Sequence, residues 1–392
     1  MIWALVRFAG SAVLVLVIVA LLAIVIVPRF LDRVYYRGPV SDHFDGARFF
    51  NLDRDDMLAP PTGGSRGGFL LRYLFGRDGR PAWPERVAVQ PSVPAARVEG
   101  ERMVVTWVGH ATMLIQTQGL NILTDPVWSD RAGPFGMIGP RRVTAPGVAF
   151  DDLPPIDLVL VSHNHYDHLD LATLDRLWRR DRPRVFTSLG NDAIIAKARV
   201  PATALDWGRS VAIKPGIDVV VTPAHHWTSR WFTDRNRALW SGFVVRLPGG
   251  NLYYSGDTGA GAFGWADTAA SYGPIRLALL PIGAFRFTDG QMASGGHMGP
   301  LDAVEAYRRT GAARAIVVHW GTFRLSYEGY DTPARMLAPA MRCAAMDPAR
   351  FDTVAIGAPI EVAAYQAPPA TAEVPRAERL ACLDTPEVRA LR

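Results

Sequence analysis

Short apolar runs that end in turn-forming residues dominate the chain after residue 98. Runs of this kind are typical of strands buried on both faces of a sheet. Ten are predicted as strands: 102–108, 113–116, 120–124, 157–161, 185–187, 217–222, 243–247, 251–255, 276–281 and 314–318. Helices are predicted over 171–180, after the N-cap residue Asp170, and over 301–309, after Pro300. Many strands with a few helices between them predict two packed sheets flanked by helices.

A different pattern occupies the N-terminus, where residues 8–27 are apolar and uncharged. As a helix this run would rise about 30 Å, the thickness of a bilayer core, whereas the apolar region of a secretory signal covers only about 7–15 residues. We therefore expect an uncleaved transmembrane helix within residues 1–30. One arginine precedes the run and three follow it closely, which favours a single-pass protein of a bacterial inner membrane with its catalytic domain in the cytoplasm.

Composition divides the rest of the chain into three parts. Residues 31–97 are rich in Gly, Pro and Arg and are expected to form an extended arm that packs on the catalytic domain. Residues 98–365 hold the predicted strands and form the expected catalytic domain. Residues 366–392 turn rich in Pro, Ala and Glu and are expected to form a peripheral tail.

Charge and cysteine content narrow the chemistry. The formal net charge is +5, and the arginines are scattered rather than gathered in a run with interleaved aromatics, so no nucleic-acid partner is expected. The two cysteines, Cys343 and Cys382, are too few for a disulfide scaffold and lack the spacing of a thiolate zinc site. Any metal must therefore be bound by histidine and carboxylate.

Three of the nine histidines fall within six residues, in the segment Ser162–His168. The apolar run before this segment places His163, His165, Asp167 and His168 at the carboxyl end of a buried strand. Imidazole and carboxylate are suitable zinc ligands when thiolate is absent. Because one strand end cannot point four side chains at a single ion, two neighbouring ions are expected. The alternative is a hydrogen-bonded histidine cluster.

Three further strand-like runs deliver similar residues at their carboxyl ends: His225 and His226 after 218–222, Asp257 after 251–255, and His319 after 315–318. Taken alone, each residue is more often a turn residue or a hydrogen-bonded histidine. Together with the first cluster they predict one site at a sheet edge. The pattern does not choose between His225 and His226.

The sequences of these segments and their order along the chain resemble those of a known family. HNHYDHLD, PAHHW, SGDTG and HWGTF resemble the metallo-β-lactamase superfamily. The flanking segments TWVGHAT (106–112), LTDP (123–126), GPRR (139–142) and DHFDG (42–46) are similar to its N-acylphosphatidylethanolamine-hydrolysing phospholipase D family. The likeness covers roughly residues 41–365. It implies an α+β four-layer αββα sandwich, the metallo-β-lactamase fold.

The resemblance also implies a role for each matching residue. One zinc would be bound by His163, His165 and His226, and a second by Asp167, His168 and His319, with Asp257 bridging the two. Asp125 would orient the metal-binding loop through hydrogen bonds, although a turn residue before Pro126 is an equal alternative. His297, in the segment GGHMGP, would contact the substrate phosphate, with a loop histidine without a role as its alternative. His110 and His43 are expected to be structural.

The implied reaction is a phospholipase D-type hydrolysis. Two Zn²⁺ ions would activate water for attack on phosphorus, releasing N-acylethanolamine and phosphatidic acid, with His297 and Asp167 as the catalytic residues. Iron or manganese also suits such ligands. The expected partners are a phospholipid substrate and the membrane bilayer. Whether the chain forms a homodimer is left open. Other phosphodiesters or a sugar-phosphate lactone are alternative substrates, and a membrane-anchored metal-binding scaffold or sensor is the non-enzymatic alternative.

The segment 131–142 carries three apolar residues, Phe135, Met137 and Ile138, between arginines. Two interpretations remain open. The loop could dip into lipid headgroups with its arginines on phosphate, or its apolar residues could pack inward.

Overall fold

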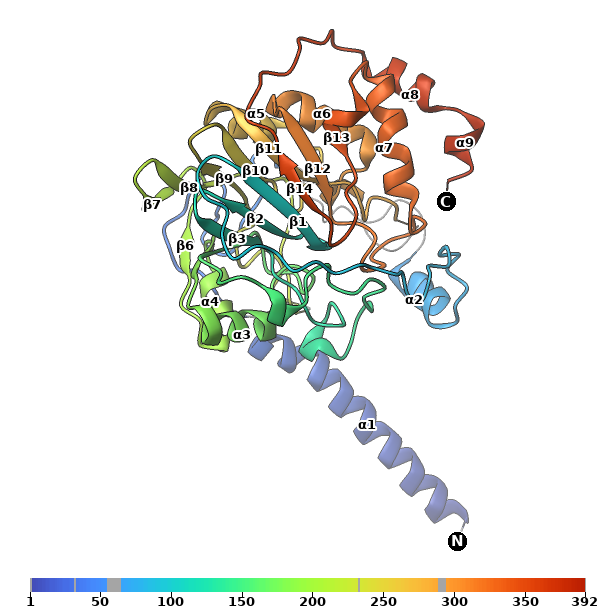
Figure 1. The fold of residues 1–392 in the computed structure, drawn as a ribbon. Coiled ribbons are helices and arrows are strands. Elements are labelled where there is room, and N and C mark those ends of the chain that lie inside the picture. Colours follow the sequence, from blue (N-terminus) through green and yellow to red (C-terminus); the bar gives the residue numbers. More distant parts are fainter. Residues whose placement is uncertain (1, 32, 55–64, 232, 288–293, 392) are drawn as a thin grey trace.

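The architecture consists of two mixed seven-stranded sheets that face each other, with helices on both outer surfaces (Figure 1). It is seen in a computed structural model that describes residues 2–31, 33–54, 65–231, 233–287 and 294–391. The resulting layer order, helix–sheet–sheet–helix, is the four-layer sandwich that the sequence predicts.

The first sheet has the strand order β14-β1-β2-β3-β4-β5-β6. Adjacent strands are antiparallel from β14 through β1 and β2 to β3, and they are parallel from β3 through β4 and β5 to β6. The bounds are β1 Met103–Gly109, β2 Thr112–Thr117, β3 Leu120–Thr124, β4 Leu158–Val161, β5 Arg184–Ser188, β6 Thr203–Leu205 and β14 Pro359–Val362.

The second sheet has the order β13-β12-β11-β10-β9-β8-β7. Here β10 to β13 run parallel and β7 to β10 are antiparallel. The bounds are β7 Ser210–Lys214, β8 Ile217–Thr222, β9 Gly242–Arg246, β10 Asn251–Tyr254, β11 Ile275–Pro281, β12 Arg314–Val318 and β13 Phe351–Asp352. All ten predicted strands are present, with ends that coincide or differ by one residue.

Helices cover the outer face of each sheet. The described helices are α1 Ile2–Leu31, α2 Arg66–Leu74, α3 Leu171–Asp181, α4 Asn191–Ile195, α5 Gly264–Ser271, α6 Pro300–Thr310, α7 Thr332–Cys343, α8 Arg376–Leu383 and α9 Pro386–Arg389. Buried side chains of α3 and α4 pack on the first sheet, and those of α5, α6 and α7 pack on the second.

The apolar runs are continuous because both faces of the strands are buried. In β8, Val219 and Val221 face the core between the sheets, while Val220 faces the helices on the other side. In β4, Leu158 and Leu160 face the inter-sheet core, while Val159 and Val161 face α3 and α4. Successive strand residues point to opposite faces, so a strand between two apolar layers needs no polar position.

The N-terminal apolar run forms α1, and its described side chains are exposed. However, within the described residues we find no helix with the length and apolar character needed to cross a membrane. The predicted transmembrane anchor, and the single-pass membrane location with a cytoplasmic catalytic domain that rested on it, are therefore wrong.

The C-terminal segment is attached to the helical layer on the second sheet. Cys343 at the end of α7 and Cys382 in α8 form a disulfide. Arg379 of α8 is buried, and its Nη2 lies 3.2 Å from Oε2 of Glu305 in α6. Leu383 joins the apolar cluster beneath α6 and α7. Two cysteines are too few for a scaffold, but they suffice to fasten one segment to the domain.

Candidate metal centre

The predicted site residues meet where four strands end. The loop after β4 carries residues 163–168, the loop after β8 carries His226, the turn after β10 carries Asp257, and His319 follows β12. β10, β11 and β12 are parallel neighbours, so their carboxyl ends lie at one edge of the second sheet. The strand ends therefore assemble the side chains that are separated by up to 156 positions along the chain, from His163 to His319.

Two groups of four possible ligands form at this edge. His163, His165, His226 and Asp257 each present one ligand atom, and these four atoms all lie within 4.8 Å of one another. Asp167, His168 and His319 form the second group, under the same limit, together with His110. The seven residues that the sequence predicts as metal ligands are thus brought together in the two expected sets.

Asp257 lies between the two groups. Its Oδ2 is 3.0 Å from Nε2 of His168 and 3.0 Å from Nε2 of His319, and it is 3.8 Å from Nε2 of His226. The turn that holds it is tight, because Gly256 has φ +62° and a Cβ there would lie 2.6 Å from the carbonyl oxygen of Ser241. Glycine at this position lets the backbone turn and aim Asp257 into the site.

Burial and neighbouring charges together set the charge states of the two groups. It lowers the pKa of His163 and His226 well below the ordinary value and that of His165 to about 3, so these imidazoles are neutral at neutral pH. Burial alone would raise the pKa of Asp257, but the charges of His168 and His319 outweigh it and hold that pKa well below its usual range. The first group thus holds neutral imidazoles, whereas nearby carboxylates outweigh burial and raise the pKa of His168 well above its ordinary value and that of His319 to about 9.

The donor atoms fit a pair of divalent cations. Although Asp257 and the two imidazoles lie 3.0 Å apart, neither pair makes a hydrogen bond. Among the described residues, several buried atoms have no hydrogen-bond partner: Nε2 of His165, His168 and His319 and both carboxylate oxygens of Asp257. Buried polar atoms are rarely left without partners, so convergent lone pairs of this kind indicate a metal site.

Outer contacts orient the histidines toward the centre. Nδ1 of His226 donates to the carbonyl oxygen of Gly296 at 2.7 Å, and Nδ1 of His168 donates to Oδ2 of Asp125 at 2.6 Å. With Nδ1 carrying the proton, Nε2 of each ring is left as the atom that faces the site. Such contacts fix both the tautomer and the ring orientation of a ligating histidine.

Asp125 makes the contacts expected of an orienting residue rather than those of a simple turn. Its side chain is fully buried. Oδ1 accepts from the backbone N–H of Ser162 at 2.7 Å, and Oδ2 accepts from the Ser162 hydroxyl at 2.5 Å, from His168 and from the Tyr254 hydroxyl. Its φ of 31° is an unusual conformation for a non-glycine residue. The carboxylate therefore joins the end of β3 to the loop that follows β4.

Arg230 is a further determinant of this loop that the sequence pattern did not reveal. It is half-buried, and its Nη1 donates to the carbonyl oxygens of Asn164 at 2.9 Å and of Leu169 at 2.8 Å. The guanidinium also lies 3.9 Å from the ring centroid of Tyr166. A lone arginine far along the chain gives no periodic or motif signal, so only the tertiary structure shows that it closes this loop.

His110 was expected to be structural and lies closer to the site than that description suggests. Its Nε2 is 3.0 Å from Oδ2 of Asp167, and its carbonyl oxygen accepts from the backbone N–H of His319 at 3.0 Å. Burial lowers the pKa of His110 to about 3. His110 and His319 both have positive φ, 53° and 61°, which concentrates backbone strain beside the predicted ligands.

The structure places His225 and His226 differently. Only His226 belongs to a ligand group, whereas Nδ1 of His225 lies 3.1 Å from Oδ2 of Asp53 in the N-terminal arm. His43, the other histidine expected to be structural, lies between Asp42 and Asp206, away from the ligand groups.

His297 lies over the ligand groups, at the inner wall of a cavity of about 430 Å³. Its Nδ1 is 3.9 Å from Oδ2 of Asp257, and burial lowers its pKa to about 4. Phe285, Leu301 and Met336 supply apolar walls of the same cavity. A neutral imidazole here can share one N–H with a ligand that enters from the cavity.

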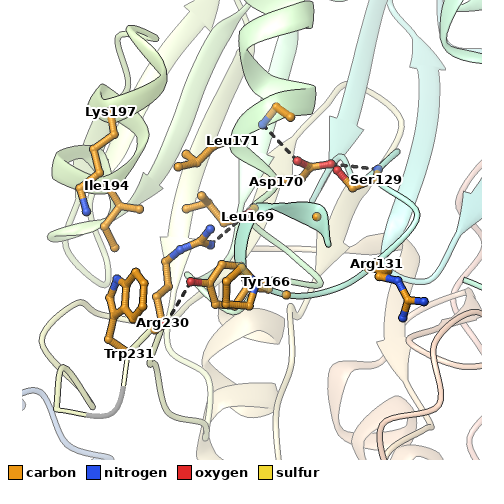
Figure 2. A pocket seen from close by; sticks show the side chains of 14 residues that line it. Ser129, Arg131, Tyr166, Leu169, Asp170, Leu171, Ile194, Lys197, Arg230 and Trp231 are labelled. Atoms are coloured by element: carbon orange, nitrogen blue, oxygen red, sulfur yellow. Dashed lines mark hydrogen bonds between the residues drawn. The ribbon is translucent and has the colours of Figure 1, made fainter. Parts of the chain in front are cut away.

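The loop 131–142 borders a second cavity, of about 360 Å³, behind the metal-binding loop. Figure 2 shows Tyr166, Arg230 and Trp231 along its wall. Met137 and Ile138 are exposed, while the side chain of Phe135 lies outside the described residues. Arg142 is buried and donates to the carbonyl oxygen of Val127, so this arginine is committed to the fold.

Comparisons with known proteins agree with this geometry. Residues 120–320 match the family model described as "Beta-lactamase superfamily domain". An uncharacterised protein of Mycobacterium tuberculosis is 35% identical over 314 residues, which is 78% of this chain and 79% of that protein. The N-acyl-phosphatidylethanolamine-hydrolyzing phospholipase D 1 of Caenorhabditis elegans is 35% identical over 239 residues, 58% of this chain and 66% of that protein.

A solved structure supports the fold independently. The isothiocyanate hydrolase from Delia radicum gut bacteria matches 67% of this chain and 100% of its own, with a TM-score of 0.52 and 18% sequence identity. The fold, the ligand groups and the relatives lead to one assignment. The chain belongs to the metallo-β-lactamase superfamily, in its N-acylphosphatidylethanolamine-hydrolysing phospholipase D-like family, and is a metal-dependent hydrolase.

Proposed function

We propose that the chain is a dinuclear zinc phosphodiesterase that hydrolyses N-acylphosphatidylethanolamine or a related phospholipid in the manner of a phospholipase D. The observation that carries this proposal is the pair of ligand groups sharing Asp257, with His297 above them at the wall of a cavity. Relatives in Caenorhabditis elegans and yeast are named for this reaction, which supports the choice of substrate.

His163, His165 and His226 would hold one Zn²⁺, and Asp167, His168 and His319 the other, with Asp257 between them. Zinc is proposed because imidazole nitrogen and carboxylate oxygen suit it in the absence of thiolate. Bound there, two such ions supply Lewis acidity toward a phosphoryl oxygen and lower the pKa of water.

The chain's own residues would orient the substrate and handle its proton. His297 is neutral, so it can donate one N–H to a phosphoryl oxygen without binding the phosphate as a fixed charge. The charge of His168 helps hold the pKa of Asp167 well below its usual range, despite burial, so this carboxylate is an acceptor. We propose that it orients the attacking water by accepting a hydrogen bond from it, while the proton that the water loses passes to the leaving oxygen.

In the proposed reaction the water oxygen bonds to phosphorus, and the bond from phosphorus to the ethanolamine oxygen breaks. The products are phosphatidic acid and N-acylethanolamine, which keeps its own oxygen and gains the proton. No covalent bond to the protein is needed. Phe285, Leu301 and Met336 would contact the apolar part of the lipid in the cavity beside His297.

The test is product mass spectrometry on the full chain, with a panel of phospholipids that includes N-acylphosphatidylethanolamine, in ¹⁸O-labelled water. We expect N-acylethanolamine without label and phosphatidic acid with one ¹⁸O, and no product after chelation. Label in the alcohol, or release of a different fragment, would refute the proposed bond cleavage. No turnover of any lipid would move the substrate to another phosphodiester or a sugar-phosphate lactone.

Asp257→Asn tests the shared ligand. We expect it to abolish turnover and to lower the bound metal below two ions per chain, as measured by elemental analysis. Asp267→Asn is the matched control, because it makes the same chemical change at an exposed carboxylate on α5 that pairs with Arg309. Full turnover in Asp257→Asn would contradict the bridging role.

A further inference from the structure

The arm before the catalytic domain contacts a predicted metal ligand directly. Asn51 is buried, and its Oδ1 accepts from the backbone N–H of His226 at 3.0 Å. Its Nδ2 donates to the carbonyl oxygen of the same residue at 3.2 Å. One carboxamide thus satisfies both backbone polar groups of His226 across 175 positions of sequence.

Both groups need a partner because His226 lies beyond the end of β8, where no strand in the described part of the chain pairs with it. Buried backbone groups without a partner are costly, so a side chain that supplies both bonds fixes the local backbone. The imidazole of His226 is held from the other side by the carbonyl oxygen of Gly296 at 2.7 Å. Backbone and ring of this ligand are therefore held by two separate segments.

The arm is itself anchored on either side of Asn51. Phe44 and Phe49 pack with Ala224, Leu239 and Trp240 in a separate apolar cluster. The backbone N–H of Phe49 donates to the carbonyl oxygen of Asn236 at 2.8 Å. These contacts allow the Asn51 side chain to act as a rigid support rather than as part of a loose extension.

Beyond Asn51, the arm makes a second contact with the same loop. Oδ2 of Asp53 lies 3.1 Å from Nδ1 of His225. Before Asn51, Nε2 of His43 donates to Oδ1 of Asp206 at 2.8 Å, and the His43 ring stacks on Trp207 with centroids 4.5 Å apart. The arm segment 41–53 thus reaches from the edge of the first sheet to the loop that carries His226.

We propose that Asn51 is a positioning residue of the metal centre, which holds His226 in place for metal binding through its backbone. The inference rests on His226 being a metal ligand, as proposed above. It makes segment 41–53 part of the active-site framework, and it predicts that a change in the arm alters metal binding at one of the two ligand groups.

The test measures binding of Zn²⁺ to the metal-free full chain by competition with a chromophoric chelator, without any lipid. Asn51→Leu keeps the number of side-chain heavy atoms and removes both hydrogen bonds, and Asn51→Ala removes volume as well. We expect both variants to weaken one of the two zinc-binding steps by about 10–100-fold and to leave the other unchanged. Turnover should fall at limiting zinc and recover with excess zinc, with KM unchanged.

Asp45→Ala is the matched control on the same arm. Among the described residues its Oδ1 accepts from the backbone N–H groups of Ala47 and Arg48, in an exposed turn, so zinc binding should equal that of the wild type. Wild-type zinc binding in a destabilised Asn51→Leu would overturn the inference, as would failure of both Asn51 variants to fold. Because lipid is absent, these results are independent of the substrate proposal.

Discussion

The disulfide between Cys343 and Cys382 should stabilise the whole domain by an amount that follows from its loop. It closes a loop with a sequence separation of 39. In the chain-entropy description, such a cross-link removes about 13 cal/mol/K from the unfolded chain, which corresponds to about 3.9 kcal/mol at 25 °C. For a domain of about 300 residues, whose entropy of unfolding is about 0.6 kcal/mol/K, the melting temperature should fall by about 6 °C when the bond is removed.

The full value applies only if the tail and the domain unfold together. The structure favours this, because Arg379 of α8 pairs with Glu305 of α6 where both side chains are buried, and Leu383 packs into the apolar cluster beneath the helices. Arg286 also donates from Nη1 to the carbonyl oxygen of Leu391 at 2.8 Å. These contacts tie the last residues to the segment that leads toward His297.

The assay is thermal unfolding of the metal-free chain with and without reductant, beside the double variant C343S/C382S. Neither cysteine is fully buried, so serine adds no buried polar group. Reduced wild type and the double variant should melt together, and reductant should not affect the variant. A shift below about 1 °C would refute the reasoning, since it would mean that the tail detaches before the domain unfolds.

Three further predictions concern the supports of the site. Asp125→Asn should weaken zinc binding by about 10–100-fold in chelator competition, because the carboxylate orients His168; unchanged affinity would exclude that role. Asp170→Ala should lower the free energy of unfolding in urea by about 1–2 kcal/mol, because the side chain caps α3; a loss below about 0.3 kcal/mol would argue against the cap. Burial alone would lower the pKa of His43, but Asp206 and Asp42 outweigh it and raise that pKa above 6.5. The free energy of unfolding that His43→Gln loses should therefore be largest near pH 6 and shrink as the pH rises through the raised pKa. A loss that grows toward pH 9 would contradict this sign.

Sequence reasoning reached much of the fold because its signals were local and strong. Strands such as β4 and β8 are buried on both faces, so their apolar runs stand out from the turns that follow. Strands at the sheet edges were missed. In β7 exposed and half-buried positions alternate, and β13 has only two residues, so neither produces a clear apolar run.

The transmembrane prediction failed for a related reason. It was based on the length of one apolar run. The length of such a run describes its amino-acid composition but does not show what surrounds the helix. The structure confirms a helix over that run but not a membrane span within the described residues. A local pattern can predict the type of an element more securely than it can predict the environment of that element.

The ligand groups were accessible to sequence reasoning because strand ends converge in any sandwich of this kind, so polar residues placed there must meet. The supports were not accessible. Arg230 holds the loop of residues 163–168 by donating to carbonyl oxygens, and Asn51 pairs with the backbone of His226. Nearly every residue carries the same backbone N–H and C=O groups. A side chain that binds these groups therefore has no partner side chain that could be recognised in the sequence.

The difference between ligands and supports also explains why His225 and His226 could not be separated in advance. The two are adjacent, chemically identical and follow the same strand. What distinguishes them is contributed by the arm, where Asp53 faces His225 and Asn51 fixes the backbone of His226. The identity of the proposed ligand at this strand end is therefore a property of two distant segments together, and a substitution in the arm should change metal binding without touching any ligand.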